Sequence, residues 1–166
     1  MQKRQVFYGI AAGIVCVGYY LVFYLIEKKL FFHPGVYWSS WLPFLGVMVF
    51  ATLRDRKKVE GPYALRQALK TCFSVFVIGS AIFQCFYYIL FNFADPSLAQ
   101  IQQEVIRESL EHYRANLGDR VVGQLEQGAA ADRLKYGLGT AVQSFARSAI
   151  GGFIVSLALA FALKKE

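Results

Sequence analysis

The chain has 166 residues, of which 56% are apolar and only 17% are charged. A water-soluble domain carries about 25% charged residues, and the apolar residues here form long runs, so the composition excludes an ordinary water-soluble domain. The net charge of +7 is interpreted as attraction of Lys and Arg to anionic lipid headgroups on one side of a membrane, and no nucleic acid is expected as a partner.

Four runs are long enough to cross a membrane, which takes about 20 apolar residues. The first has no charged residue, the second is the shortest, and the fourth is interrupted by Arg147. The pattern predicts an all-α fold, a four-transmembrane-helix bundle that forms one integral membrane domain over residues 1–166. The spans cover about residues 6–26, 36–53, 71–94 and 138–163.

The first run follows the basic start MQKRQ, so a secretory signal peptide is the alternative interpretation. The run of 21 residues is too long for a signal core of about 7–15 residues. No small-x-small cleavage site follows before Glu27. We therefore expect a first span that is retained.

Between spans three and four, residues 95–136 predict an amphipathic helical excursion outside the membrane. Asp95 and Pro96 favour a helix start, because a carboxylate accepts backbone N–H groups and proline has none to satisfy; a catalytic role for Asp95 is the less favoured alternative. The polar face is acidic, which favours packing on the span ends or on a partner over binding to a membrane surface. Apolar residues recur here at steps of three and four: Leu98, Ile101, Val105, Ile106, Leu110, Tyr113 and Leu117.

Four spans place both termini on one side of the membrane. Ten basic and three acidic residues then lie on that side, whereas the other side holds eight of each. Because Lys and Arg near span ends are retained in the cytoplasm, we expect cytoplasmic termini. Tyr and Trp residues would gather at the outer boundary as an interfacial belt, with a cavity lining as the alternative for the tyrosines. The residues of the belt are Tyr19, Tyr20, Tyr24, Trp38, Trp41, Tyr87 and Tyr88.

Two polar residues lie where polarity is costly, Gln84 in span three and Arg147 in span four. Such residues are candidate ligand or lipid contacts by default. The alternatives are that Gln84 makes an interhelical hydrogen bond and that Arg147 extends outward to the membrane boundary.

Small residues mark two helix faces for close packing. Gly9 and Gly13 form a Gly-x-x-x-Gly pattern in span one, and span four carries a ridge with a spacing of four. Small residues let helix backbones approach closely in lipid. We expect spans one and four to pack on each other, with a second subunit as the alternative. The ridge consists of Ser144, Ser148, Gly152, Ser156 and Ala160.

No motif indicates catalysis, a metal or a cofactor. Cys16, Cys72 and Cys85 lie inside spans and are interpreted as small buried hydrophobic residues. His33 and His112 have no companion at metal-ligand spacing. No phosphate-binding loop, serine elbow or His-Glu-x-x-His pattern occurs.

The order of four segments resembles a bacterial family of membrane proteins called domain of unknown function 4199. The segments are YGIAAGI, GPYALRQALKTCF, FNFADPSLAQ and IGGFIVSLALAFALKKE, and the resemblance covers almost the whole chain. It implies four spans in the inner membrane and assigns no activity or catalytic residue.

Two functions follow as hypotheses. The first is a non-catalytic inner-membrane accessory or scaffold protein, which packs through small-residue ridges and engages another membrane protein or a second copy of itself. The second is a small transporter or lipid-binding protein that uses Arg147 and Gln84. An integral-membrane enzyme is a third possibility and would require several titratable groups in one polar pocket.

The topology can be tested by labelling with an impermeant maleimide in intact spheroplasts. A cysteine introduced near Glu108 should react before lysis, because residues 95–136 are expected outside, and one at the C-terminus only after lysis. The unmodified chain controls for labelling of its own cysteines, and the reverse order of reaction would show an inverted topology.

Overall fold

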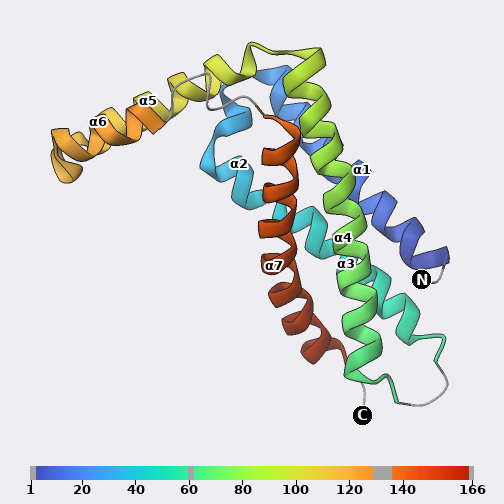
Figure 1. Cartoon of the computed structure of the whole chain (residues 1–166). Coiled ribbons are helices and arrows are strands. Elements are labelled where there is room, and N and C mark those ends of the chain that lie inside the picture. The colour runs from blue at the N-terminus through green and yellow to red at the C-terminus, as the bar shows by residue number, and fades with distance from the viewer. Residues whose placement is uncertain (1–2, 60–61, 129–135, 165–166) are drawn as a thin grey trace.

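The computed structural model describes residues 3–59, 62–128 and 136–164, and these residues contain helices and no β-strand (Figure 1). Four helical segments are long and apolar enough to span a membrane. The predicted all-α bundle is confirmed, and the chain is a multi-pass membrane protein. The helices are α1 (Lys3–Ile26), α2 (Pro34–Ser39), α3 (Trp41–Arg56), α4 (Leu65–Ile89), α5 (Leu98–Leu117), α6 (Asp119–Gly128) and α7 (Leu138–Leu163).

The second span is broken, with α2 and α3 separated at Ser40. Pro43 lies in the first turn of α3 and has no N–H group, so the carbonyl of Ser39 loses the donor that a continuous helix would supply. At the start of α2, His33 accepts a hydrogen bond from the Gly35 N–H at 3.1 Å and caps the helix. The second span therefore consists of a short α2 followed by the longer α3.

Helix α4 is the common packing partner of α1, α3 and α7. Its buried residues recur at steps of three and four, so one face of α4 is covered from Ala68 to Ser80. The expectation that spans one and four pack on each other is wrong, because α1 and α7 each pack on α4 instead. The buried residues of α4 are Ala68, Thr71, Cys72, Val75, Phe76, Gly79 and Ser80.

Glycine allows these close approaches. A Cβ added to Gly9 would lie 2.6 Å from the Cβ of Ile78, and one added to Gly152 would lie 2.0 Å from Cε1 of Phe76. Such distances leave no room for a methyl group. The small residues of spans one and four thus bring both helices onto α4.

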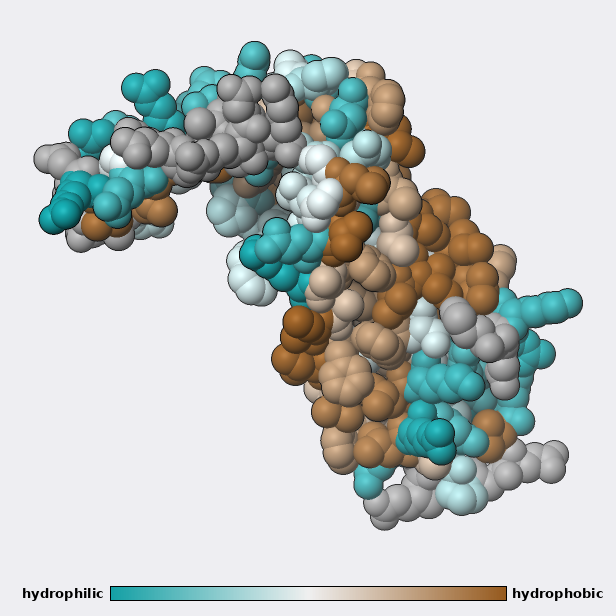
Figure 2. Space-filling view, in the orientation of Figure 1, coloured by the Kyte–Doolittle hydropathy of each residue, from teal (hydrophilic) through white to brown (hydrophobic). Residues whose placement is uncertain are grey.

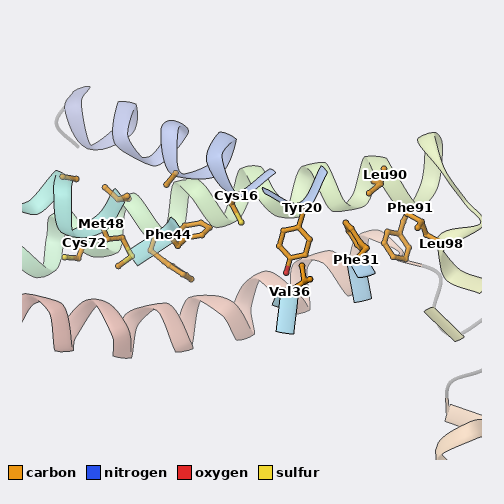
Figure 3. Packing of buried hydrophobic residues seen from close by; sticks show 14 residues of the cluster. Cys16, Tyr20, Phe31, Val36, Phe44, Met48, Cys72, Leu90, Phe91 and Leu98 are labelled. Atoms are coloured by element: carbon orange, nitrogen blue, oxygen red, sulfur yellow. The ribbon is translucent and has the colours of Figure 1, made fainter. Parts of the chain in front are cut away.

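The buried core follows α4 from Cys72 and Met48 to Phe91 and Leu98 (Figure 3). Aromatic rings fill much of its middle. Phe76 stacks on Trp41 with ring centroids 5.8 Å apart and lies 5.4 Å from the Phe44 ring. These two neighbours hold the Phe76 ring in place.

Helices α5 and α6 form a hairpin, here called the arm, which projects sideways from one end of the bundle (Figure 1). Gly118 joins them with a φ of 76°, a conformation that favours glycine. Among the described residues of the arm, Leu98 and Ile101 at the start of α5 pack on the core, and the arm projects away from the bundle (Figure 1). The final part of the predicted excursion, residues 129–135, lies outside the described residues.

The two ends of the bundle differ in charge. We call the end with α2 and the arm the arm end, and the opposite end, where both termini and residues 54–58 lie, the basic end (Figure 1). Figure 2 shows hydrophobic surface over the bundle, with hydrophilic residues gathered on the arm and near the basic end. This distribution is typical of a protein that crosses a membrane.

Gly152→Ala should destabilise the bundle by about 1–3 kcal/mol, the usual cost of overpacking. The new methyl group would overlap the Phe76 ring, which its neighbours hold in place. Gly151→Ala is the matched control, since its Cβ would lie 3.9 Å from Trp41 in ordinary contact. The measurement is the thermal unfolding midpoint of the detergent-solubilised protein, and equal midpoints for the two variants would contradict the packing.

Candidate functional site

A cavity of about 700 Å³ lies toward the arm end, between α4, α7 and the elements that lead into α3. A volume of this size suits a small ligand, since ligand pockets measure about 300–1,000 Å³. The cavity has one polar wall and one aromatic wall, so it is amphiphilic. Both polar residues selected from the sequence, Gln84 and Arg147, line it.

The polar wall belongs to α7. Thr140, Ser144, Arg147 and Ser148 line the cavity, and their spacing of four, seven and eight residues from the first places them on one helix face. Ser144 and Ser148 were predicted to form part of a packing ridge. In the structure they line the cavity, whereas Gly152, Ser156 and Ala160 further along the ridge are buried in the bundle.

The opposite wall is built from aromatic residues of the 3₁₀ turn Leu30–Phe32 and of α2 and α3. Cys16 and Tyr20 of α1 and Phe76, Phe83 and Tyr87 of α4 also line the cavity. The aromatic wall consists of Phe31, Phe32, Tyr37, Trp38, Trp41 and Phe44.

Gln84 is held by the segment that precedes α7. Its side-chain oxygen accepts a hydrogen bond from the Tyr136 hydroxyl, while the Tyr136 carbonyl accepts one from Asn92 at 2.8 Å. Burial raises the pKa of Tyr136, so the phenol stays protonated and remains a donor. In the described part of the chain, no partner occupies the amide nitrogen of Gln84, which leaves it able to donate to a ligand.

Arg147 lies nine residues after Leu138, the first residue of α7, which places it about 14 Å along the helix at 1.5 Å per residue. Its side chain is exposed at the cavity. Among residues 3–59, 62–128 and 136–164, no carboxylate lies within 4 Å of its guanidinium group. The guanidinium charge is therefore available to an anion in the cavity.

An ionic cluster ties the cavity rim to the arm. Buried Asp95 accepts hydrogen bonds from Lys28, from the Tyr24 hydroxyl at 2.9 Å and from Ser97. Lys29 pairs with Glu104 at 3.0 Å and Glu108 at 2.8 Å. Because Lys28 and Lys29 directly precede the 3₁₀ turn that carries Phe31 and Phe32, these contacts position part of the aromatic wall.

The start of α5 differs in detail from the expected cap. Helix α5 begins at Leu98 with Ser97 at its N-cap, and Pro96 precedes the helix. Asp95 accepts the backbone N–H of Ser97 at 3.2 Å, so its carboxylate orders the turn before the helix rather than the first helical turn. The π-helical turn Leu90–Ala94 delivers Asp95 to this position, with the Asp95 N–H donating to the Leu90 carbonyl at 2.8 Å.

The link from Asp95 to Lys28 was missed in the sequence, because no local pattern joins residues 67 positions apart. In the described part of the chain, no group of three or more His, Cys, Asp or Glu residues could hold a metal ion.

Comparison with known proteins gives one result. A family model described as "Protein of unknown function (DUF4199)" matches residues 7–165, almost the whole chain. No curated protein and no solved structure matches the chain. The function therefore has to be inferred from the site itself.

The Asp95 cluster predicts a pH dependence of stability. Hydrogen bonds from Lys28, then from Ser97, lower the pKa of Asp95 from 3.8 to about 2 in the folded protein. A lowered folded-state pKa stabilises the protein above the unfolded value, and this contribution is lost as the pH falls from about 4 towards 2.

The wild-type unfolding midpoint should therefore fall between pH 5 and pH 3 more steeply than that of Asp95→Asn, which should also be less stable at pH 7. Glu108→Gln is the control, because that carboxylate is exposed. Parallel pH profiles for wild type and Asp95→Asn, measured by thermal unfolding in detergent, would contradict the assignment.

Proposed function

Because the chain belongs to the DUF4199 family, whose function is unknown, we propose a function from its geometry: the protein binds an anionic amphiphile, a phospholipid, without catalysis. The observation that supports the proposal is the convergence of Arg147 and Gln84 on one amphiphilic cavity. Of the two functions predicted from the sequence, this was the alternative, and the cavity now favours it.

The headgroup binds at the polar wall. Arg147 presents a planar fork of N–H donors that fits a phosphate or carboxylate in bidentate fashion. Ser144 and Ser148 supply hydroxyl groups on the same wall, and the Gln84 amide faces the same space. Hydrogen bonds between a charged donor and an anion are stronger than bonds between neutral groups.

The acyl chains lie along the aromatic wall. Trp41 and Phe44 offer flat apolar surface deeper in the cavity, and Phe76 continues it on α4. The volume of about 700 Å³ holds the headgroup and the first part of the chains, and the rest extends into the surrounding lipid. An amphiphile thus satisfies both walls at once, whereas a free inorganic anion satisfies only one.

The orientation belongs to the same proposal. The basic residues after α3 favour a cytoplasmic basic end, and hence cytoplasmic termini and an arm outside the inner membrane of a bacterium. The cavity then lies in the outer half of the bilayer. Its ligand is a lipid of the outer leaflet.

A scaffold function is the second candidate, and the arm is the observation that favours it. Tyr113, Val121 and Leu125 are exposed apolar residues on the arm, beyond the part that packs on the bundle. They offer a surface to another membrane protein or to a second copy of the chain. Gly9 of α1 and Gly152 of α7 are less suited to this purpose, because both already pack closely on α4.

The test is binding of phosphatidylglycerol and phosphatidylcholine to the purified protein, measured by native mass spectrometry and by the lipid-induced shift of the unfolding midpoint. Wild type should prefer phosphatidylglycerol, and Arg147→Gln should lose affinity for it by about tenfold or more, as expected when a charged hydrogen-bonding partner is removed. Arg147→Lys should retain part of the affinity.

Arg107→Gln is the matched control, since Arg107 is an exposed arginine on the arm away from the cavity. Without lipid, Arg147→Gln should unfold at the same temperature as wild type, because Arg147 is exposed and forms no ion pair in the described part of the chain. Unchanged lipid binding in Arg147→Gln would refute the proposal. A protein that co-purifies in place of lipid would favour the scaffold function.

A further inference from the structure

A second, smaller pocket of about 300 Å³ lies at the basic end, between the start of α1 and the end of α3. Four of its six lining residues carry a positive charge, and none carries a negative charge. The remaining two are aromatic. The lining residues are Lys3, Arg4, Phe7, Tyr8, Arg54 and Lys58.

A polar cluster behind the pocket explains why these charges converge. Gln5 of α1 donates to the Thr71 hydroxyl at 3.1 Å, and Thr71 donates to Asp55 of α3 at 2.9 Å. Thr71 on α4 thus holds both helices at adjacent positions. Arg4, which precedes Gln5, and Arg54, which precedes Asp55, are brought to one pocket as a result.

The four cations lack acidic partners in the part of the chain that the structure describes. No Asp or Glu there lies within 4 Å of Lys3, Arg4, Arg54 or Lys58. Asp55, the carboxylate next to Arg54, accepts a hydrogen bond from Thr71 and does not line the pocket. Like charges held together repel one another, so the arrangement is most stable with an anion between them.

We propose that this pocket binds the phosphate of an anionic phospholipid in the leaflet at the basic end. Basic pockets between membrane helices are suited to such headgroups. The four cations surround the phosphate, and Arg4 and Arg54 donate to it from two different helices.

The surroundings favour a lipid over a free phosphate ion. Phe7 is 67% exposed and Phe50 is 56% exposed, and the ring of Tyr8 lies 6.1 Å from that of Phe50. The charged pocket therefore continues directly into apolar surface on α1 and α3. A phosphate with acyl chains contacts both, whereas a free phosphate contacts only the cations.

This site is separate from the cavity at the arm end. Cys16, the first α1 residue that lines the cavity, follows Tyr8, the last α1 residue that lines the basic pocket, by 8 positions, which corresponds to about 12 Å along the helix. The inference does not depend on the proposed function. Evidence against one site would not count against the other, since Arg147→Gln should not affect binding at the basic end.

The experiment titrates the full-length protein in detergent with dihexanoyl phosphatidylglycerol, dihexanoyl phosphatidylcholine and inorganic phosphate, using the unfolding midpoint and native mass spectrometry as readouts. Titrations are made in the Arg147→Gln background to remove the other site. Arg4→Gln/Arg54→Gln should weaken phosphatidylglycerol binding about tenfold or more, because two charged donors are lost.

Lys57→Gln/Arg66→Gln is the matched control. It removes the same charge from exposed residues of the same end that do not line the pocket, and it should change the affinity by less than about threefold, as expected from diffuse attraction alone. Arg4→Lys/Arg54→Lys should restore most of the binding. If the first double variant does not fold, the single variant Arg54→Gln carries the test, with an expected loss of about threefold.

Three results would overturn the proposal. Equal losses in the two double variants would show a diffuse basic surface in place of a site. Inorganic phosphate that binds as tightly as phosphatidylglycerol would show a site for free anions. Equal affinity for phosphatidylcholine would show that net negative charge is not recognised.

Discussion

Close backbone contact between α4 and its neighbours is the constraint on which the bundle depends. In lipid, apolar side chains gain little by leaving one apolar environment for another, so helices associate through tight packing and hydrogen bonds. Gly9 and Gly152 provide that packing, since a Cβ at either position would overlap a side chain of α4. In the described part of the chain, α1 and α7 each have α4 as their main packing partner.

The two ends of the molecule are organised by the same device, a buried oxygen that connects several elements. At the basic end, the Thr71 hydroxyl joins α1, α3 and α4 through Gln5 and Asp55. At the arm end, the Asp95 carboxylate joins the end of α1 to the start of α5 through Tyr24 and Lys28. In each case the polar group lies behind the surface that it organises. Deleting either group should therefore disturb a site that it does not itself line.

Much of the architecture could be predicted from the sequence because the signals are local. Long apolar runs define the spans, and the polarity of Arg147 and Gln84 makes them conspicuous within those runs. Their convergence on one cavity could not be predicted, since it depends on the rotation of α4 and α7 about their axes. Pro43 could have predicted the separation of α2 from α3, because proline has no N–H group to donate within a helix.

Aromatic residues show where a single interpretation was too narrow. Tyr20, Trp38, Trp41 and Tyr87 were expected to form an interfacial belt, with a cavity as the alternative for the tyrosines alone, and all four line the cavity. An aromatic ring near the membrane boundary can belong to the interfacial belt and also line a cavity, when the helix that carries it borders that cavity. The Lys28–Asp95 contact could not be predicted either, because oppositely charged residues far apart in sequence have many possible partners.

The attachment of the arm has a mechanical consequence. Helix α5 contains 20 residues and extends about 30 Å from its origin. Asp95, just before the helix, pairs with Lys28, and Glu104 and Glu108 within the helix pair with Lys29, next to the aromatic wall. A protein that binds the far end of α5 would move the entrance of the cavity through this helix. By thermodynamic reciprocity, a lipid that shifts Phe31 and Phe32 would alter the grip of that protein by the same factor. Lipid binding in the cavity would then change the binding of a partner about 30 Å away, at the far end of the arm.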